Sequence, residues 1–184
     1  MQLYHDKVYW QQDCDEKIST YDNVIISAPT GSGKTERYES WAFNKKERPV
    51  FITSPIKSLS NQRFRQLQEK GYSVALETGD IKVFPEEDAD VICCTQEIYN
   101  NKYRSLPNVT LIVDEFSYIF HEPERARAYV DSLYYSKAKN ILICSATLGD
   151  INLVQRYLEN LTNRTFFLYE TKDRLTSLEY IMIM

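Results

Sequence analysis

A glycine-rich stretch that follows an apolar run is the strongest chemical signal in this sequence. The stretch "SAPTGSGKT" (27–35) comes directly after the run "NVIIS" (23–27). Gly31 and Gly33 allow a tight turn in which consecutive backbone N–H groups point inward at one anion. A helix that begins near Gly33 would add its positive N-terminal end. The pattern therefore predicts a strand, an anion-binding loop and a helix in succession.

The loop ends in a lysine and a threonine, which suit the phosphates and the metal of a bound nucleotide. Lys34 can reach the β- and γ-phosphates, and the hydroxyl of Thr35 can hold Mg²⁺. Ala28 departs from the general pattern, which has glycine at this place. The competing interpretation is a glycine-rich turn with a chance Lys-Thr pair, and the flanking strand and helix disfavour it. The residues expected to bind the nucleotide are Ala28, Pro29, Thr30, Gly31, Ser32, Gly33, Lys34 and Thr35.

Two adjacent carboxylates, Asp114 and Glu115, stand at the end of the apolar run 110–114. Taken alone, they fit a strand that merely ends in water as well as they fit a site. Beside a phosphate loop, Asp114 suits a further ligand for the metal, and Glu115 suits a base that takes a proton from water. A kinase of this loop class would not need the adjacent glutamate. The pair therefore favours hydrolysis over transfer to a substrate.

A third apolar run, within "ILICSATLGD" (141–150), ends in the hydroxyl groups of Ser145 and Thr147. Serine, threonine and Asp150 commonly begin helices, so helix capping competes with a role at the site. The position of this run after the Asp-Glu pair favours a role at the site.

Short apolar runs alternate with amphipathic stretches from end to end. Continuous apolar runs are typical of strands buried on both faces, and their alternation with helical spacing is typical of a parallel sheet covered by helices. The sequence therefore predicts an α/β fold with three layers and a mainly parallel central sheet. The expected strands are 23–27, 50–54, 73–77, 90–94, 110–114, 140–145 and 165–169, and the expected helices include 57–70, 96–105, 123–137 and 150–161.

Length and composition set limits on the class of protein. A chain of 184 residues fits one ordinary domain. A net charge of −4 argues against gripping nucleic acid by charge alone, but it leaves room for local phosphate contacts. No apolar run is long enough to cross a membrane and no leader opens the chain, so we expect a cytoplasmic protein without a membrane partner. Reduced, buried thiols are the favoured interpretation of Cys14, Cys93, Cys94 and Cys144.

Taken in order, the motifs resemble those of superfamily-two DExH/D-box helicases. They are "APTGSGKT", "TSPIKSLSNQRF", "TGD", "TQE", "VDEFSY" and "SAT". The stretch 53–64 is most similar to the superkiller-type (Ski-like) RNA helicases, in which the Ala28 variant of the loop is normal. The resemblance covers roughly residue 8 to the end. It implies the first RecA-like motor domain of an ATP-dependent RNA helicase, a P-loop NTPase domain that binds ATP and Mg²⁺.

The resemblance assigns the same roles to the residues already singled out. Lys34, Asp114 and Glu115 would be catalytic, and Thr35 with Asp114 would hold the metal.

The resemblance also adds residues to the nucleotide site. Gln11 stands where the family's adenine-reading glutamine lies, with Gln12 as its rival and a plain surface glutamine as the alternative. Ser145 and Thr147 would couple the nucleotide to RNA. Their strand is expected between the other two motif strands, close to the γ-phosphate.

The nucleic-acid face, for single-stranded RNA above all, is implied by three motif stretches. Hydroxyls, backbone amides and helix N-termini can hold a phosphate backbone with little net charge, which agrees with a sequence pI of about 5.3. For the cations alone, a solvated helix face is an equal alternative. The residues implied are Ser54, Pro55, Lys57, Asn61, Arg63, Thr78, Gly79, Thr95 and Glu97.

Ser117 departs from the family, which usually has histidine at this place. That histidine helps to relay between the nucleotide and RNA sites, so the departure bears on the coupling and not on the hydrolytic pair.

The expected division of the chain is a motor domain over 1–172. Residues 173–184 are expected to be a linker or first strand toward a second RecA-like domain in cis. The motifs of that second domain do not occur in this sequence. Alternatives are a DNA translocase or defence-system helicase of the same superfamily, and a non-catalytic ATP-binding adaptor.

Overall fold

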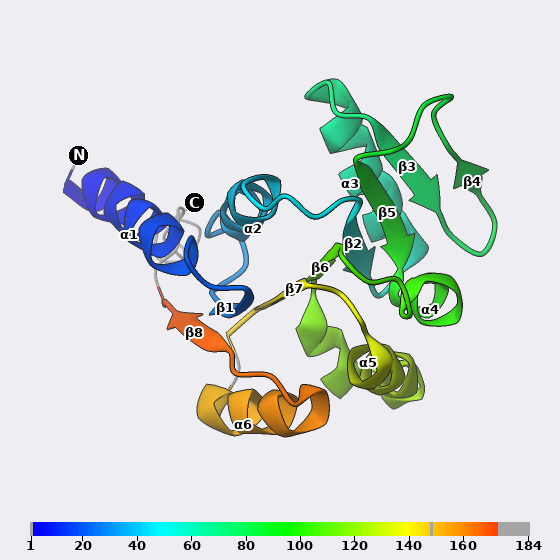
Figure 1. The fold of residues 1–184 in the computed structure, drawn as a ribbon. Helices are drawn as coiled ribbons and strands as arrows, with labels where there is room; N and C mark the ends of the chain where they lie inside the picture. The colour runs from blue at the N-terminus through cyan, green and yellow to red at the C-terminus, as the bar shows by residue number, and fades with distance from the viewer. Residues whose placement is uncertain (1, 148, 173–184) are drawn as a thin grey trace.

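The computed structural model describes residues 2–147 and 149–172, which form an α/β fold around one eight-stranded sheet (Figure 1). The strand order is β4-β3-β5-β2-β6-β7-β1-β8, and only β4 runs antiparallel to its neighbour. The expected linker over 173–184 lies outside the described residues. The strands are β1 (Asn23–Ser27), β2 (Val50–Ser54), β3 (Val74–Glu77), β4 (Lys82–Val83), β5 (Val91–Thr95), β6 (Thr110–Val113), β7 (Asn140–Ser145) and β8 (Phe167–Glu170).

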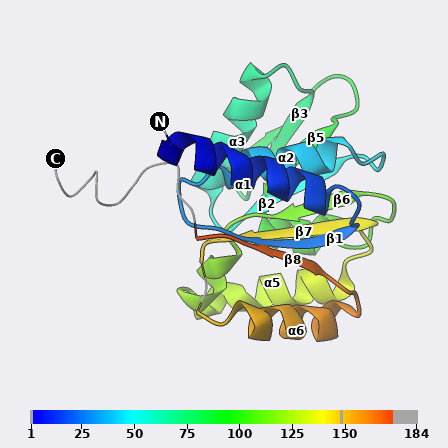
Figure 2. The same ribbon diagram turned by 90° about the vertical axis from the view of Figure 1, so that its left-hand side faces the viewer.

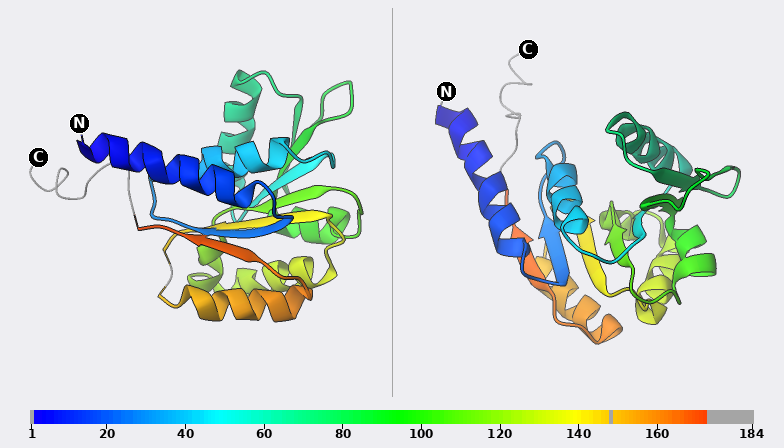
Figure 3. Two further views of the ribbon diagram at one scale, coloured as in Figure 1. Left: turned by 60° about the vertical axis from the view of Figure 1, so that its left-hand side comes forward. Right: turned by 45° about the horizontal axis from the view of Figure 1, so that its top comes forward.

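Helices cover both faces of the sheet, so the fold has three layers. Figures 2 and 3 show α1, α2 and α3 on one face, and α5 and α6 on the other. The short helix α4 follows β5 near the edge that carries β4. The helices are α1 (Gln2–Ile18), α2 (Lys34–Phe43), α3 (Lys57–Glu69), α4 (Gln96–Ile98), α5 (Pro123–Tyr135) and α6 (Ile151–Thr162).

Two hydrophobic clusters, one on each face, hold the layers together. Along β1, Val24 and Ile26 belong to the cluster that includes α1, α2 and α3, while Ile25 belongs to the cluster that includes α5 and α6. This alternation follows from the two-residue period of a strand. Strands β2, β5 and β7 are buried along their whole length, which confirms the prediction of a mainly parallel sheet with both faces covered.

The expected helix over 96–105 differs from the observed structure. Helix α4 begins normally, with Thr95 Oγ1 accepting a hydrogen bond from Ile98 N at 3.3 Å. It then widens into a π-helical turn over Tyr99–Tyr103. Both tyrosine rings pack on Phe51, with centroids 5.4 and 4.8 Å away. We attribute the widened turn to this shared packing, which the polar spacing of the sequence does not reveal.

The four cysteines are free and buried. Burial raises the pKa of the Cys93 thiol to about 12, so this thiol is neutral and unreactive near pH 7.

None of the helices in the described part of the chain is long and apolar enough to span a membrane.

Replacing Ile112 with alanine should destabilise the fold strongly. The side chain lies on the central strand β6 with 0% exposure, so truncation leaves a cavity. Ile112→Ala should lower the free energy of unfolding by about 2–5 kcal/mol in urea denaturation. Leu106→Ala, at a residue that is 41% exposed, is the control and should cost less than about 1 kcal/mol. Equal losses in the two variants would contradict the placement of β6 in the core.

Candidate active site

The glycine-rich stretch forms a loop between β1 and α2, as the sequence predicts. It is tied to the neighbouring strand because Ala28 N donates to Ser145 O at 3.1 Å. Gly31 and Gly33 have φ values of 77° and 92°, a region that strains any residue with a side chain. A Cβ on Gly33 would lie 2.7 Å from Gln11 Nε2. The backbone conformation therefore favours glycine at position 33, and a Cβ there would also have to move the Gln11 amide.

The loop also holds buried polar atoms that suit a ligand. Ser32 and, just before the loop, Ser27 are 0% exposed. Their Oγ atoms have no hydrogen-bond partner among residues 2–147 and 149–172. Buried hydroxyls rarely stay unpaired in a folded protein. Together with the glycine cradle, these atoms fit an oxygen-rich group such as a phosphate.

Gln11, not Gln12, contacts the phosphate loop. Gln11 lies on α1, and its Nε2 donates to Ser32 O at 3.1 Å. Gln12 is exposed one residue further along the helix. The helix is held by Tyr169 of β8, whose ring stacks on Trp10 at 6.1 Å and whose hydroxyl donates to Asp13 at 2.8 Å.

Asp114 follows β6 directly and is buried. It is 8% exposed, and its backbone N donates to Thr53 O at 3.0 Å. Oδ1 accepts from the backbone N of Glu115 at 2.9 Å. Oδ2 accepts from Tyr38 OH at 3.0 Å and pairs with Arg63 NH2 at 3.5 Å. The guanidinium and the hydrogen bonds thus balance the cost of burying this carboxylate.

Glu115 has an unusual backbone conformation and an altered acidity. Its φ of 55° lies in the left-handed region, where strain is often kept at functional sites. Burial and the charge of Asp114 raise the pKa of Glu115 above its ordinary value, while the charge of Lys34 opposes the shift. A carboxylate with a raised pKa is a stronger base.

Ser145 lies where the sequence predicts, on a strand between the other two motif strands. Strand β7 pairs with β6 on one side and β1 on the other, with Ser145 opposite Ser27. Its Oγ donates to Ala146 O at 3.0 Å. Thr147 is exposed just beyond the strand, and Ser117 is half-buried in the 3₁₀ turn that follows Glu115.

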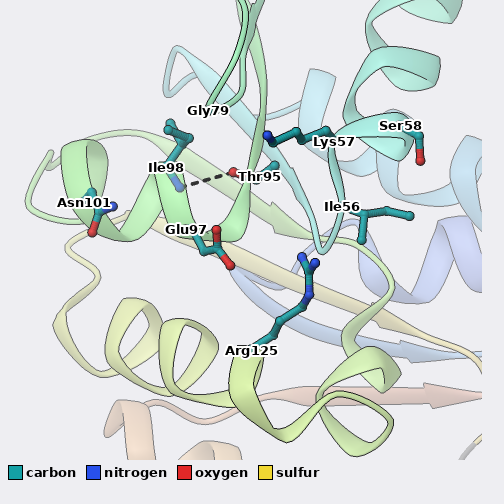
Figure 4. Close-up of a pocket in the computed structure, with 9 residues that line it drawn as sticks. All are labelled: Ile56, Lys57, Ser58, Gly79, Thr95, Glu97, Ile98, Asn101 and Arg125. Atoms are coloured by element: carbon teal, nitrogen blue, oxygen red, sulfur yellow. Dashed lines mark hydrogen bonds between the residues drawn. The ribbon is translucent and has the colours of Figure 1, made fainter.

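A cleft of about 570 Å³ opens at the carboxyl ends of the parallel strands, between α3, α4 and α5 (Figure 4). Four of the residues expected at the nucleic-acid face meet there, although they are far apart in the sequence. The Lys57 stem runs past Gly79, since a Cβ on that glycine would lie 3.5 Å from Lys57 Cε. The lining residues are Ile56, Lys57, Ser58, Gly79, Thr95, Glu97, Ile98, Asn101 and Arg125.

Four other expected residues support the cleft without lining it. Ser54 Oγ and Ser60 Oγ share a hydrogen bond of 2.5 Å, and Asn61 Nδ2 donates to Lys57 O at 3.2 Å. Thr78 Oγ1 accepts from Ile81 N at 3.2 Å, which closes the turn that carries Gly79. The carbonyl of Pro55 accepts from Arg125 NH1.

Arg63 requires a correction. The sequence places it at the nucleic-acid face, but its guanidinium pairs with Asp114 and lies over the Tyr38 ring at 5.7 Å. Its side chain is only 17% exposed, and it lines a separate hollow that also includes Thr35. The physical reason is the buried carboxylate, which attracts the nearest cation on α3. Arg63 therefore lies beside Asp114 and Thr35, away from the cleft.

Sequence reasoning missed Tyr38 and Arg125. Tyr38 follows Lys34 by four residues on α2, so helical spacing could have placed it on the same face. Arg125 is one of several cations in α5, and no sequence signal marks it as the one that enters the cleft.

Comparison with known proteins agrees with this geometry. The family model described as "DEAD/DEAH box helicase" matches residues 9–155. The chain belongs to this family. Nucleotide binding is implied by that membership, and the expected resemblance to superkiller-type helicases is confirmed by the relatives.

Among the relatives is human Superkiller complex protein 2, which is 30% identical over 90% of this chain. The human exosome RNA helicase MTR4 is 28% identical over 93% of it. The chloroplastic DExH-box ATP-dependent RNA helicase DExH15 of Arabidopsis thaliana is 29% identical over 87%. The chain spans only 14%, 17% and 16% of these three proteins, respectively.

Solved structures show the same fold. The DUF1998 helicase MrfA bound to DNA and AMPPNP superposes with a TM-score of 0.66 at 15% identity, covering 89% of this chain and 27% of that one. The helicase domain of Hef from Pyrococcus furiosus superposes with a TM-score of 0.53 at 21% identity, covering 89% and 37%. The RecA-like fold predicted from the sequence is thereby confirmed.

Gly33→Ala should cost stability as well as distort the loop. Alanine at a φ of 92° is strained, and its Cβ displaces Gln11 from Ser32. We expect the free energy of unfolding to fall by about 1–3 kcal/mol in urea denaturation. Gly149→Ala is the matched control, because nothing lies within 4 Å of its Cβ position. A Gly33 variant as stable as the Gly149 variant would show that the loop adopts another conformation.

Proposed function

We propose that this chain is the ATP-binding motor domain of an ATP-dependent RNA helicase, which hydrolyses ATP to move on or unwind RNA once joined to a second RecA-like domain. The observation that carries the proposal is that the phosphate loop, Asp114 and Glu115 all lie at the carboxyl ends of the parallel strands. Tyr38, one helical turn after Lys34 on α2, donates its hydroxyl to Asp114 Oδ2 at 3.0 Å, so the helix that follows the loop contacts the carboxylate pair. An adaptor without catalysis would need neither the strained backbone nor the raised pKa of Glu115.

In the proposed nucleotide site, each residue has one task. The loop amides and Lys34 hold the phosphates, and Gln11 reads the adenine from α1. Thr35 and Asp114 would hold Mg²⁺, which neutralises phosphate charge when bound. Glu115 orients a water molecule and accepts its proton. Ser145 and Thr147 lie at the end of β7 and would respond to the state of the nucleotide.

The cleft of Figure 4 is the proposed site for a single strand of RNA. Lys57 and Arg125 supply cations for phosphates, and the N-terminal end of α3 supplies backbone amides. The names of two of the relatives above, the exosome RNA helicase MTR4 and the DExH-box ATP-dependent RNA helicase DExH15, support RNA as the substrate. Translocation on DNA is the second candidate, because the MrfA structure contains DNA.

The reduced state of the cysteines supports a further part of the proposal. All four thiols are free and buried. Free thiols are typical of reducing compartments, and we propose that the protein works in the cytoplasm.

Nucleotide binding should depend on Lys34. Lys34→Ala removes the cation aimed at the phosphates, so a fluorescent ATP analogue should bind at least about tenfold more weakly, the equivalent of about 1.4 kcal/mol. Lys46→Ala, an exposed lysine beyond the end of α2, should bind the analogue as the parent does. Equal affinities in the two variants would rule out the phosphate-loop assignment.

The chain by itself should bind ATP but hydrolyse it very slowly. In this class of enzyme an arginine from a partner domain stabilises the transition state, and such an arginine is worth about 10³–10⁵ in rate. Phosphate release should be compared between residues 1–184 and a longer protein that includes the second domain, with single-stranded RNA, with DNA and without nucleic acid. RNA-stimulated turnover in the longer protein alone is expected. Stimulation by DNA only would favour the translocase, and equal turnover in both chains would overturn the need for a second domain.

A further inference from the structure

Tyr38 connects the phosphate-loop helix to the carboxylate of Asp114. It lies on α2, one helical turn after Lys34 and Thr35, and is 0% exposed. Its hydroxyl donates to Asp114 Oδ2 at 3.0 Å, across 76 positions of sequence. One helix therefore carries the phosphate cation, the proposed metal ligand Thr35 and a donor to the other proposed metal ligand.

The hydroxyl is the only close side-chain partner of Asp114 among the described residues. Oδ1 accepts from the backbone of Glu115 at 2.9 Å, whereas Oδ2 meets Arg63 only at 3.5 Å. Gln66 Oε1 holds the other nitrogen of that guanidinium at 2.5 Å, and the guanidinium lies 5.7 Å from the centre of the Tyr38 ring. Without the Tyr38 hydroxyl, Oδ2 would keep a single long contact and the carboxylate could rotate.

We propose that Tyr38 is a positioning residue for the binding of Mg·ATP. Its O–H fixes the Asp114 carboxylate relative to α2, so that Lys34, Thr35 and Asp114 keep one arrangement when the metal and nucleotide arrive. The proposal rests on the proposed Mg·ATP site. Ligands of a metal are commonly oriented by such neighbouring hydrogen bonds, whose loss costs about 10–100-fold in metal affinity.

Packing by the Tyr38 ring and hydrogen bonding by its hydroxyl can be tested separately, because one substitution removes the hydroxyl and keeps the ring. Phenylalanine at position 38 fills the same space and keeps the contacts of the ring with Arg63. A role in packing alone therefore predicts little change in Tyr38→Phe, whereas a role in positioning predicts a change that appears only when the metal is present.

The experiment measures the affinity of a fluorescent ADP analogue in Mg²⁺ and in EDTA. The ratio of the affinity in Mg²⁺ to the affinity in EDTA is the gain that the metal provides. In the parent, Mg²⁺ should tighten binding. Tyr38→Phe should reduce that gain by about tenfold while the affinity in EDTA stays within about twofold. Tyr157→Phe, on α6 and 47% exposed, is the control and should keep the parent's ratio.

A second variant, Asp114→Asn, separates this inference from the proposed function. If Mg²⁺ gives no gain in the parent, or a gain that Asp114→Asn retains, the proposed metal site itself is wrong. If Asp114→Asn loses the gain and Tyr38→Phe keeps it, only the inference about Tyr38 is overturned. An equal loss in Mg²⁺ and EDTA would show a merely structural role and would also overturn it.

A double variant adds an independent check. In the Asp114→Asn background, Tyr38→Phe should change the ratio no further, because the group it positions is gone. An additional loss in the double variant would mean that Tyr38 acts by another route, and the proposal would fail. Thermal midpoints of all variants establish that each is folded during the titrations.

Discussion

The burial of one carboxylate constrains the whole site. Asp114 is 8% exposed, and a buried charge is costly unless charge and hydrogen bonds balance it. Tyr38 from α2, Arg63 from α3 and the backbone at Glu115 supply that balance. The carboxylate therefore joins the phosphate-loop helix to the helix whose first turn lines the cleft.

Much of this arrangement follows from local sequence patterns. The conformation of the glycines and the flanking periodicity determine the strand, loop and helix around Gly33. The sequence predicts all three elements, and the structure confirms them. The carboxyl ends of β1, β7 and β6 lie side by side because these strands are parallel neighbours in the sheet. The sequence predicts a nucleic-acid face from three motif stretches, and one residue of each, Lys57, Gly79 and Thr95, lines the same cleft.

What the sequence could not give depends on side-chain direction in three dimensions. Arg63 and Lys57 lie on one helix, yet one pairs with Asp114 and the other lines the cleft. Helical spacing puts these two residues on different faces of α3, but it does not show that the Arg63 face meets a buried carboxylate. Arg125 likewise enters the cleft because α5 packs beneath α4, which no pattern within α5 indicates. The widened turn at Tyr99 depends on the ring of Phe51, a neighbour from another strand.

The proposed site for the metal and the phosphates lies between the loop and Asp114, not in the cleft. A crystal structure of the chain with Mn²⁺ and a non-hydrolysable ATP analogue tests it most directly, because anomalous scattering locates manganese without reference to the protein. We expect one manganese peak beside Thr35 and Asp114, with the phosphates on the amides of the glycine-rich loop. Manganese away from Asp114, or phosphates bound between Lys57 and Arg125, would contradict it.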